Sequence, residues 1–513
     1  MNHTHAIYWL KRDFRLFDNP ALTEALANHT SVMPLFIYEN SWLNAPETSA
    51  FHVFAVRSAL NDLQSNIERK GGQMGIANGE VLPKLEQLYR LQPFTHLYSH
   101  EEIGINRTYQ RDIAVGEWCK KRGVTWTELP QTGVFRRLPN RDVRQKMWKK
   151  FTFDTLLPKP NDKDLRRLVI AEKWKSALLV KPYLELNDPA FLLTPAQRNQ
   201  LQPVSETDAE KTLRSFLYAR GVNYRGGISS PLTAVTAGSR LSVHLAWGTI
   251  TGRTVYQKVQ ERKAELKESD DPQAGKWRSS LTSFLSRLHW RDHFIQRLES
   301  EPKMEFEPLN PAYKELVYDN NPEFLKAWVT GQTGFPMVDA CIRCLQTTGF
   351  VNFRMRAMLT SVACHTLHLD WRLIDHPMAK MYTDYEPGIH VSQLQMQASV
   401  VGINTIRIYS PNKQIVDQDP DTIFIKRWIP ELKEFSADQI IKHRKDPLGD
   451  YPGQLVDWWT ASREMKDRLW TIRKLPDTKE TAQQVFQKHG SRKGPASRRR
   501  KVIKGDGASD KAA

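Results

Sequence analysis

The sequence predicts an α/β domain built on a doubly wound parallel sheet, followed by a large all-α domain. Over residues 6–130, short β-branched and aromatic runs alternate with amphipathic stretches, the order expected of parallel strands joined by helices. From about residue 206 to 475, helical periodicity dominates and strand signals nearly vanish. The length of 513 residues agrees, because it suits two or three domains.

Five short apolar runs are the predicted strands of the first domain. They are AIYWL (6–10), SVMPLFIYE (31–39), QMGIA (73–77), THLYSHE (95–101) and VTWTELP (124–130). The dipeptide Asn19-Pro20 predicts the start of a helix, because proline fits the first helical turn. The segment after the first strand is KRDFRLFDNPAL rather than a GxGxxG motif.

Changes in composition divide the chain into four parts. Residues 1–130 form the predicted α/β domain, and residues 131–205 form a connector rich in Lys, Arg and Pro, with a basic helical piece at RDVRQKMWKKF. Residues 206–475 form the predicted all-α domain, in which Ser279-Ser280 are expected to cap a long helix. Residues 476–513 are low in apolar residues, so we expect a basic, disordered tail.

The charge of the chain predicts a polyanionic partner, with nucleic acid as the first candidate. Seventy-four Lys and Arg against 57 Asp and Glu give a net charge of +17. The stretch Ser491–Lys504 holds seven of these cations, and removing them still leaves about +10 on the rest of the chain. Fifteen tryptophans and fifteen tyrosines add planar faces for stacking on bases or on a planar cofactor.

The location expected from the sequence is the cytoplasm, or the nucleoid if the source is bacterial. No apolar run approaches the ~20 residues needed to cross a bilayer. The first residues, MNHTHAIYWLKRDFRL, place charges straight after a short apolar stretch and do not form a signal peptide. We expect no membrane partner, and a monomer is the default oligomeric state.

The cysteines are expected to be core residues. Four cysteines in 513 residues do not make a disulfide framework. Cys341 and Cys344 form a CxxC, but they lie in the pattern VDACIRCLQTTG, which is typical of an amphipathic helix. Small buried side chains therefore fit this pair better than a redox or metal site does, and we predict no metal site.

Two stretches of the helical domain have residues suited to an anionic ligand. The segment GSRLSVHLAWGTIT (238–251) opens a predicted helix with glycine and serine beside an arginine, which suits a phosphate group. Arg354 and Arg356 precede Asp384 and Glu386 at a distance in sequence that permits a buried ion pair. Such pairs are costly to bury, so they often serve a function.

A third stretch, RLHWRDHF (287–294), combines Trp290 and Arg291 with further ionisable side chains. Charged residues at this spacing are also typical of a solvated helix face. From the residues alone, this stretch fits either a functional site or a solvated helix face.

Seven segments in a fixed order carry a resemblance to a known family. They are IYWLKRDFRLFDNPAL, SRLSVHLAWGTITGR, LHWRDHF, TGFPMVDACIRCLQTTGFVNFRMRAM, LDWR, TDYEPGIHVSQLQMQAS and IRIYSPNKQIVDQDPDTIFIKRWIPEL. In these segments the chain resembles the cryptochrome/photolyase family over nearly all of residues 6–435. The resemblance implies an α/β antenna domain, a long connector and a helical domain that holds FAD. It also allows a second antenna chromophore, a folate or a deazaflavin.

The resemblance implies a set of cofactor-binding residues in the helical domain. Asp384 is expected to pair with Arg356 and to keep positive charge beside the flavin, and Glu386 to face the polar edge of the ring. His390 stands where the family usually places an asparagine, so proton exchange with the flavin is expected to differ. The full set is Tyr224, Gly238, Ser239, Arg240, Leu241, Ser242, Arg356, Asp384, Tyr385, Glu386 and His390.

The family's electron-transfer chain of three tryptophans is not conserved in this sequence. Trp371 occupies the middle position of that chain. Leu394 stands at the position nearest the flavin, and Ala312 or Tyr313 at the outermost one. We therefore expect that photoreduction through tryptophans is absent or rerouted through tyrosines.

The predicted pocket for damaged DNA keeps part of the family pattern. Trp290 and Arg291 match residues that stack on and anchor damaged bases, and Arg407 matches an arginine on the DNA-facing side. Arg287 stands where repair enzymes usually carry a glutamate, while Met396 and Phe353 replace a tryptophan and an asparagine and keep the pocket apolar. The residues expected to carry the reaction are Trp290, Arg291, Arg287, Met396 and His390.

Two functions of different classes follow from the resemblance. The first is a DNA repair enzyme in which light-excited, reduced FAD gives an electron to a UV-induced pyrimidine dimer. The second is a cryptochrome-like blue-light receptor without repair activity. The positive charge with Trp290, Arg291 and Arg407 favours DNA repair, and both a cyclobutane dimer and a (6-4) product fit the sequence. A flavoprotein that binds damaged or single-stranded DNA without catalysis is a third possibility.

Overall fold

The N-terminal domain contains one parallel sheet of five strands. The computed structural model describes residues 5–179 and 189–490. The strands lie in the order β3-β2-β1-β4-β5 and are all parallel. Their bounds are β1 His5–Trp9, β2 Ser31–Tyr38, β3 Gly75–Asn78, β4 His96–His100 and β5 Thr125–Leu129. Each strand overlaps one of the five predicted runs, with ends that differ by up to two residues, so the predicted doubly wound sheet is confirmed.

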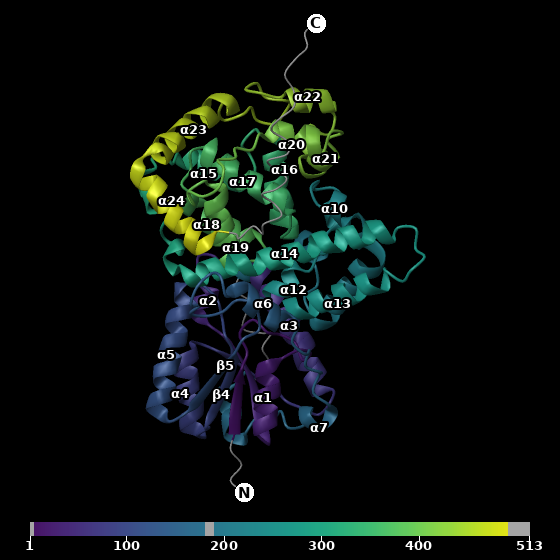
Figure 1. The fold of residues 1–513 in the computed structure, drawn as a ribbon, viewed down its shortest axis with the longest axis vertical. Helices are drawn as coiled ribbons and strands as arrows, with labels where there is room; N and C mark the ends of the chain where they lie inside the picture. The colour runs from purple at the N-terminus through teal and green to yellow at the C-terminus, as the bar shows by residue number, and fades with distance from the viewer. Residues whose placement is uncertain (1–4, 180–188, 491–513) are drawn as a thin grey trace.

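Helices cover both faces of this sheet (Figure 1). Side chains alternate along β1, so that Ala6 and Tyr8 pack against α1 (Pro20–Asn28) and α3 (Ala50–Glu68). Ile7 and Trp9 pack on the other face against α4 and α5. Burial on both faces explains why the run AIYWL is apolar throughout rather than alternating. The remaining helices of this domain are α2 (Asn40–Leu43), α4 (Val81–Leu91) and α5 (Asn106–Arg122).

Helix α1 begins where the sequence predicted. Pro20 is its first residue, and the side chain of Asn19 accepts a hydrogen bond from the Leu22 N–H at 3.0 Å. The connector contains α6 (Arg144–Thr152), α7 (Asp162–Leu165) and α8 (Pro195–Gln200). Helix α6 is the predicted basic helical piece.

The second domain is helical, and α14 crosses the molecule between this domain and the sheet (Figure 1). Among its described residues, strand-type pairing is limited to one isolated bridge between Leu448 and Tyr451. The helices are α9 (Glu206–Ser215), α10 (Tyr224–Gly227), α11 (Ala234–Ala237), α12 (Ser242–Ala246), α13 (Gly252–Glu265), α14 (Ala274–Ser300), α15 (Pro322–Thr330), α16 (Pro336–Thr348), α17 (Phe353–His365), α18 (Trp371–Met381), α19 (Pro387–Gln397), α20 (Pro411–Gln418), α21 (Ile423–Trp428), α22 (Ala437–Lys442), α23 (Trp458–Lys474) and α24 (Pro476–His489).

Two expectations, one about this domain and one about the segment that follows it, were wrong. Helix α14 begins at Ala274, so Ser279-Ser280 lie inside it and cap nothing. The Ser280 hydroxyl instead donates to the Val222 carbonyl at 2.9 Å, which joins α14 to the preceding segment. The predicted disordered tail also begins too early, because residues 476–489 form α24, whose Val485 is buried. The basic stretch Ser491–Lys504 lies outside the described residues.

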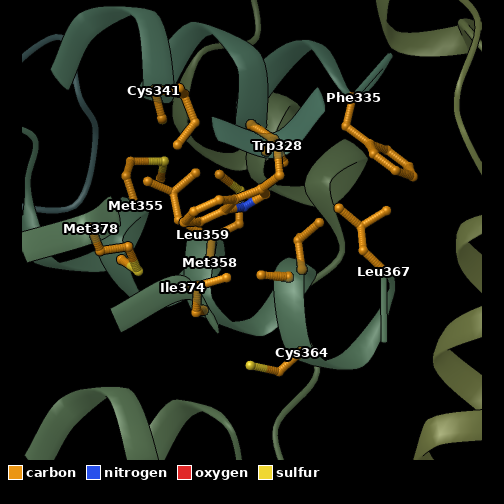
Figure 2. Close-up of a cluster of buried hydrophobic side chains, with 14 of the residues drawn as sticks. Trp328, Phe335, Cys341, Met355, Met358, Leu359, Cys364, Leu367, Ile374 and Met378 are labelled. Carbon is orange, nitrogen blue, oxygen red and sulfur yellow. The ribbon is translucent and has the colours of Figure 1, made fainter. Parts of the chain in front are cut away.

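The core of the helical domain is built around Trp328. Figure 2 shows its indole beside Met358 and Leu359, with Cys341 and Cys364 among the surrounding side chains. Cys341 and Cys344 are buried thiols of this core, as expected from the amphipathic pattern. Burial raises the pKa of the Cys344 thiol to about 11, so this group is protonated near neutral pH. No helix among the described residues has the length and apolar character needed to cross a bilayer.

A buried ion pair fixes the first domain to the second. Arg253, in the first turn of α13, donates through Nε to Asp18 Oδ2 at 2.8 Å, and the Thr251 hydroxyl donates to the same oxygen at 2.6 Å. Burial by itself would raise the pKa of Asp18, but the hydrogen bonds from Arg253 and Thr251 outweigh it and hold this pKa below its usual value. Close to this pair, Gly248 has a positive φ, and a Cβ there would overlap the Arg12 carbonyl oxygen.

Candidate functional site

The centre of the candidate site is an ion pair between Arg356 on α17 and Asp384 in the loop between α18 and α19. Two parallel hydrogen bonds join the guanidinium to the carboxylate, each at 3.0 Å. The sequence predicted this pair. Burial tends to raise the pKa of Asp384, but Arg356 and a hydrogen bond from Ser242 hold it below its usual value. The carboxylate is therefore charged at neutral pH.

The guanidinium of Arg240 adds a second positive charge beside this ion pair. Arg240 lies over the Phe350 ring, 3.6 Å from its centroid, and its Nη1 is buried without a hydrogen-bond partner among the described residues. Burial lowers the pKa of Arg240 to about 10, with Asp384 opposing the shift and Arg356 adding to it. Two guanidiniums thus face a single carboxylate, an arrangement that favours an anionic ligand.

The segment 238–242 contributes to the candidate site through side chains rather than through backbone N–H groups. The N–H of Gly238 donates to the Ala234 carbonyl at 3.0 Å, so it is not free for a phosphate as the sequence suggested. The carbonyls of Gly238 and Ser239 accept hydrogen bonds from Arg220, and Leu241 is buried in the core. Arg240 and Ser242 are the members of this segment that act on Asp384.

Tyr224 lies in the wall behind this segment. Its ring packs edge-on against Phe216 and Phe284, with centroids 5.6 and 5.5 Å away. Burial raises the pKa of the Tyr224 hydroxyl to about 12, and a hydrogen bond with Arg287 opposes this shift. The structure therefore places Tyr224 beside Arg287, which is exposed on α14, and in the same buried cluster as Leu241 of the 238–242 segment.

A second cluster connects the loop to α14 and to the α/β domain. Arg291 Nη2 donates to Glu386 Oε2 at 3.2 Å, and Arg12 Nη1 lies 3.9 Å from the same oxygen. Burial raises the pKa of Glu386, and the two arginines oppose that shift. Tyr385, which precedes Glu386, stacks its ring on His52 of α3 with centroids 5.5 Å apart. The loop 384–386 is thus held from three sides.

His390 is buried on α19 and is fixed by a partner that the sequence did not indicate. Its Nε2 lies 2.7 Å from Oδ1 of Asp375 on α18 and 3.2 Å from the carbonyl oxygen of the same residue. A carboxylate at this distance fixes the imidazole orientation and lets Nε2 hold a proton. The rings of Tyr385 and Tyr382 lie beside His390, at 5.4 and 6.0 Å between centroids.

The residues expected at the electron-transfer positions lie in one apolar core. Trp371, Leu394 and Tyr313 are all buried in the cluster that surrounds Trp328, and Ala312 packs against that cluster. Arg372, beside Trp371, is exposed and its guanidinium lies 5.5 Å from the Trp371 ring centroid.

The residues expected to contact DNA lie on several different elements of the helical domain. Trp290 is 38% exposed on α14, and its ring stacks on Phe294 at 5.7 Å. Phe353 and Arg407 are exposed. Met396, expected beside Trp290 in the pocket, packs against the buried cluster of Leu298, Met304, Leu309, Val391, Val401 and Val485. Its thioether therefore contributes to packing between α19, α14 and α24.

Sequence reasoning missed several residues that shape the site. Asp375 orients His390, and the Phe350 ring lies against the Arg240 guanidinium. Arg12 reaches Glu386 from the loop after β1. A signal was present for Arg12, because the opening segment KRDFRL places charges straight after a buried strand. No comparable signal marks Asp375, whose role depends on how α18 packs against α19.

The donor set of the site fits a flavin nucleotide. Guanidinium nitrogens of Arg240 and Arg356 and the hydroxyl of Ser242 are the groups that bind phosphate oxygens or an electron-rich ring. The buried Nη1 of Arg240 and Oγ1 of Thr383 have no partner among the described residues, so polar atoms remain available for a bound group.

Two family models match separate parts of this chain. The family model described as the FAD binding domain of DNA photolyase matches residues 284–471, and the model described as DNA photolyase matches residues 6–152. A deoxyribodipyrimidine photo-lyase of Alkalihalophilus pseudofirmus is 25% identical over 478 residues, which cover 88% of this chain and 94% of that protein.

Two solved structures share the fold. A bacterial class III photolyase from Agrobacterium tumefaciens has a TM-score of 0.77 at 22% identity and covers 93% of this chain and 99% of its own. A cryptochrome from Synechocystis sp. PCC6803 has a TM-score of 0.78 at 19% identity and covers 91% of this chain and 100% of its own. A photolyase and a cryptochrome thus match the fold almost equally well.

The excess of guanidinium groups gives a testable difference between two substitutions. In protein freed of any bound small molecule, we expect Asp384→Ala to lower the free energy of unfolding by about 3 kcal/mol, because it leaves Arg356 without its partner. Arg240→Met should cost about 1 kcal/mol or less, because the lost contact with Phe350 is offset by removal of an unpaired buried charge. Chemical denaturation measures both values. Equal costs would contradict the proposed charge excess.

Proposed function

Because this chain belongs to the cryptochrome/DNA photolyase family and carries the FAD-binding domain of that family, we propose that it is a light-driven enzyme that splits UV-induced pyrimidine dimers in DNA. The curated relative described above is a deoxyribodipyrimidine photo-lyase and extends over most of this chain, which supports the repair activity. The net charge of +17 supports a DNA substrate.

One observation carries the proposal: an exposed indole stands next to the ion pairs of the cofactor site. Trp290 presents its ring to solvent on α14, and the next residue, Arg291, donates to Glu386. Glu386 lies two residues after Asp384, which pairs with Arg356. A damaged base that stacks on Trp290 would therefore lie close to the loop that holds the cofactor.

Each residue of the site has a distinct proposed role. When bound and reduced, FAD supplies the electron that light transfers to the dimer. The positive charges of Arg356 and Arg240 would stabilise the negative charge of the reduced cofactor. Asp384 fixes the Arg356 guanidinium in place. His390 holds a proton on Nε2 through its contact with Asp375.

The DNA-side residues position the substrate. Trp290 provides the stacking surface, and Arg291 keeps the loop 384–386 close to α14 through Glu386. Arg287 and Arg407 are exposed cations that suit DNA phosphates. Arg287 replaces a hydrogen-bonding acid, and the loss of such a bond typically costs ~1–3 kcal/mol, which one new phosphate contact offsets.

The repair assay tests this function directly. Chemically reduced protein is mixed with an oligonucleotide that carries one thymine dimer, illuminated, and compared with a dark sample. We expect light-dependent loss of the dimer, and about 10- to 100-fold weaker binding for Trp290→Ala, because a stacked base contributes ~1–3 kcal/mol. Trp459→Ala is the matched control, since Trp459 is exposed on α23, away from the site.

Three outcomes of the assay are distinct. Loss of the dimer in light supports the enzyme. If the dimer is bound but persists, an oligonucleotide with a (6-4) product is the second substrate to illuminate. An absence of both repair and preference for damaged DNA would sink the proposal and leave the blue-light receptor as the better function.

We also propose that photoreduction of the bound flavin through the family's tryptophan chain is absent in this protein or rerouted through tyrosines. Leu394 cannot relay an electron, so blue light on the oxidised protein should give no fast tryptophan-radical signal in transient absorption. We expect Leu394→Trp to introduce such a signal if the variant retains FAD, whereas Trp371→Phe should change nothing. A fast tryptophan radical in the unaltered protein would contradict this route.

A further inference from the structure

The junction between the connector and α14 buries guanidinium nitrogens that lack hydrogen-bond partners among the described residues. Arg144, the first residue of α6, is 1% exposed, and Arg297 on α14 is 5% exposed. Nε and Nη2 of Arg144 and Nε and Nη1 of Arg297 are buried without hydrogen-bond partners among the described residues. A buried guanidinium is normally satisfied by acceptors, so these four nitrogens call for a bound acceptor.

The histidine between these arginines intensifies the shortage of acceptors. Nδ1 of His293 contacts the guanidinium of Arg141, and Nε2 lies 3.3 Å from Nη2 of Arg297. Guanidinium groups only donate, and a neutral imidazole has one acceptor nitrogen, so one of the two contacts sets N–H against N–H. Burial and the charges of Arg297, Arg141 and Arg144 lower the pKa of His293 to about 2, so the imidazole is neutral.

The carboxylate of Asp292, which acts on Arg144, is already shared. Asp292 Oδ2 accepts from Trp148 Nε1 at 2.8 Å, and Oδ1 accepts from Arg291 Nη1 at 3.2 Å. The charge of Asp292 acts on Arg144, whereas Arg297 is affected by burial and by Arg141, which together lower its pKa to about 10. Positive charge therefore exceeds negative charge in this junction.

We propose that Arg144 and Arg297, with Arg141, bind an oxyanion of the phosphate class at this junction. The planar fork of arginine suits phosphate oxygens and would give the unpartnered nitrogens their acceptors. Such a ligand would also resolve the contact conflict at His293, because Arg297 could turn its donors to the anion. Neither Arg144 nor Arg297 belongs to the cofactor site or to the DNA-contacting residues described above.

The position of the junction indicates which phosphate it takes. His293 follows Trp290 by one helical turn, and their rings meet edge-on with centroids 5.1 Å apart. On the proposed repair function, the phosphate belongs to the DNA strand whose base stacks on Trp290. Inorganic phosphate is the other source of the same chemistry, and the experiment below separates the two.

The first experiment measures phosphate binding in the full-length protein. Calorimetric titration with inorganic phosphate at constant ionic strength should show binding that weakens about tenfold or more in Arg297→Met. The melting temperature of Arg297→Met in chloride should equal or exceed that of the unaltered protein, because the substitution removes an unpaired buried charge. Arg278→Met, an exposed position on the same helix, is the matched control and should keep the binding.

The second experiment identifies a DNA phosphate. Binding of a duplex with one thymine dimer is measured across a salt series, and one lost phosphate contact reduces the slope of log K against log salt by about 0.9. A reduced slope in Arg297→Met assigns the site to DNA, whereas an unchanged slope with lost phosphate binding assigns it to a free anion. No phosphate binding with an unchanged slope would overturn the proposal, as would a clear loss of stability in Arg297→Met. These readouts do not depend on repair activity.

Discussion

The candidate site depends on a local excess of positive charge around Asp384. Arg356 and Arg240 both act on this one carboxylate, and Arg240 keeps a buried nitrogen without a partner among the described residues. A site of this kind is stable only if neighbouring elements hold the cations in place. Both domains contribute, because Trp247 after α12 and His52 on α3 bond to the carbonyls of Thr383 and Tyr382, at 2.8 and 2.9 Å, next to Asp384.

The same loop connects the candidate site to the surface of α14. Glu386 is bound by Arg291, and Trp290 beside it is the exposed aromatic residue on which the proposed function rests. Arg12 approaches Glu386 from the end of β1, so the parallel sheet contributes to the site although it lies in the other domain. The buried contact between Asp18 and Arg253 keeps the two domains in this relation.

The sequence predicted the features that depend on local residue patterns or on the segments that follow one another in the family's order. The five strands were readable because each is a short apolar run, and the Arg356–Asp384 pair because both residues lie in recognisable segments. It did not reveal Asp375 as the partner of His390, because that contact depends on the packing of two helices. Nor did polar composition reveal α24, which folds because Val485 packs into a distant cluster.

The midpoint potential of the bound FAD tests most directly whether positive charge around Asp384 stabilises the reduced cofactor. In a redox titration of Arg356→Gln that retains FAD, the account predicts a potential lower by roughly 30–60 mV, equivalent to about 1.4–2.8 kcal/mol for a two-electron couple. Arg354→Gln, a control on the same helix, should shift it much less. An unchanged or higher potential in Arg356→Gln would contradict the account.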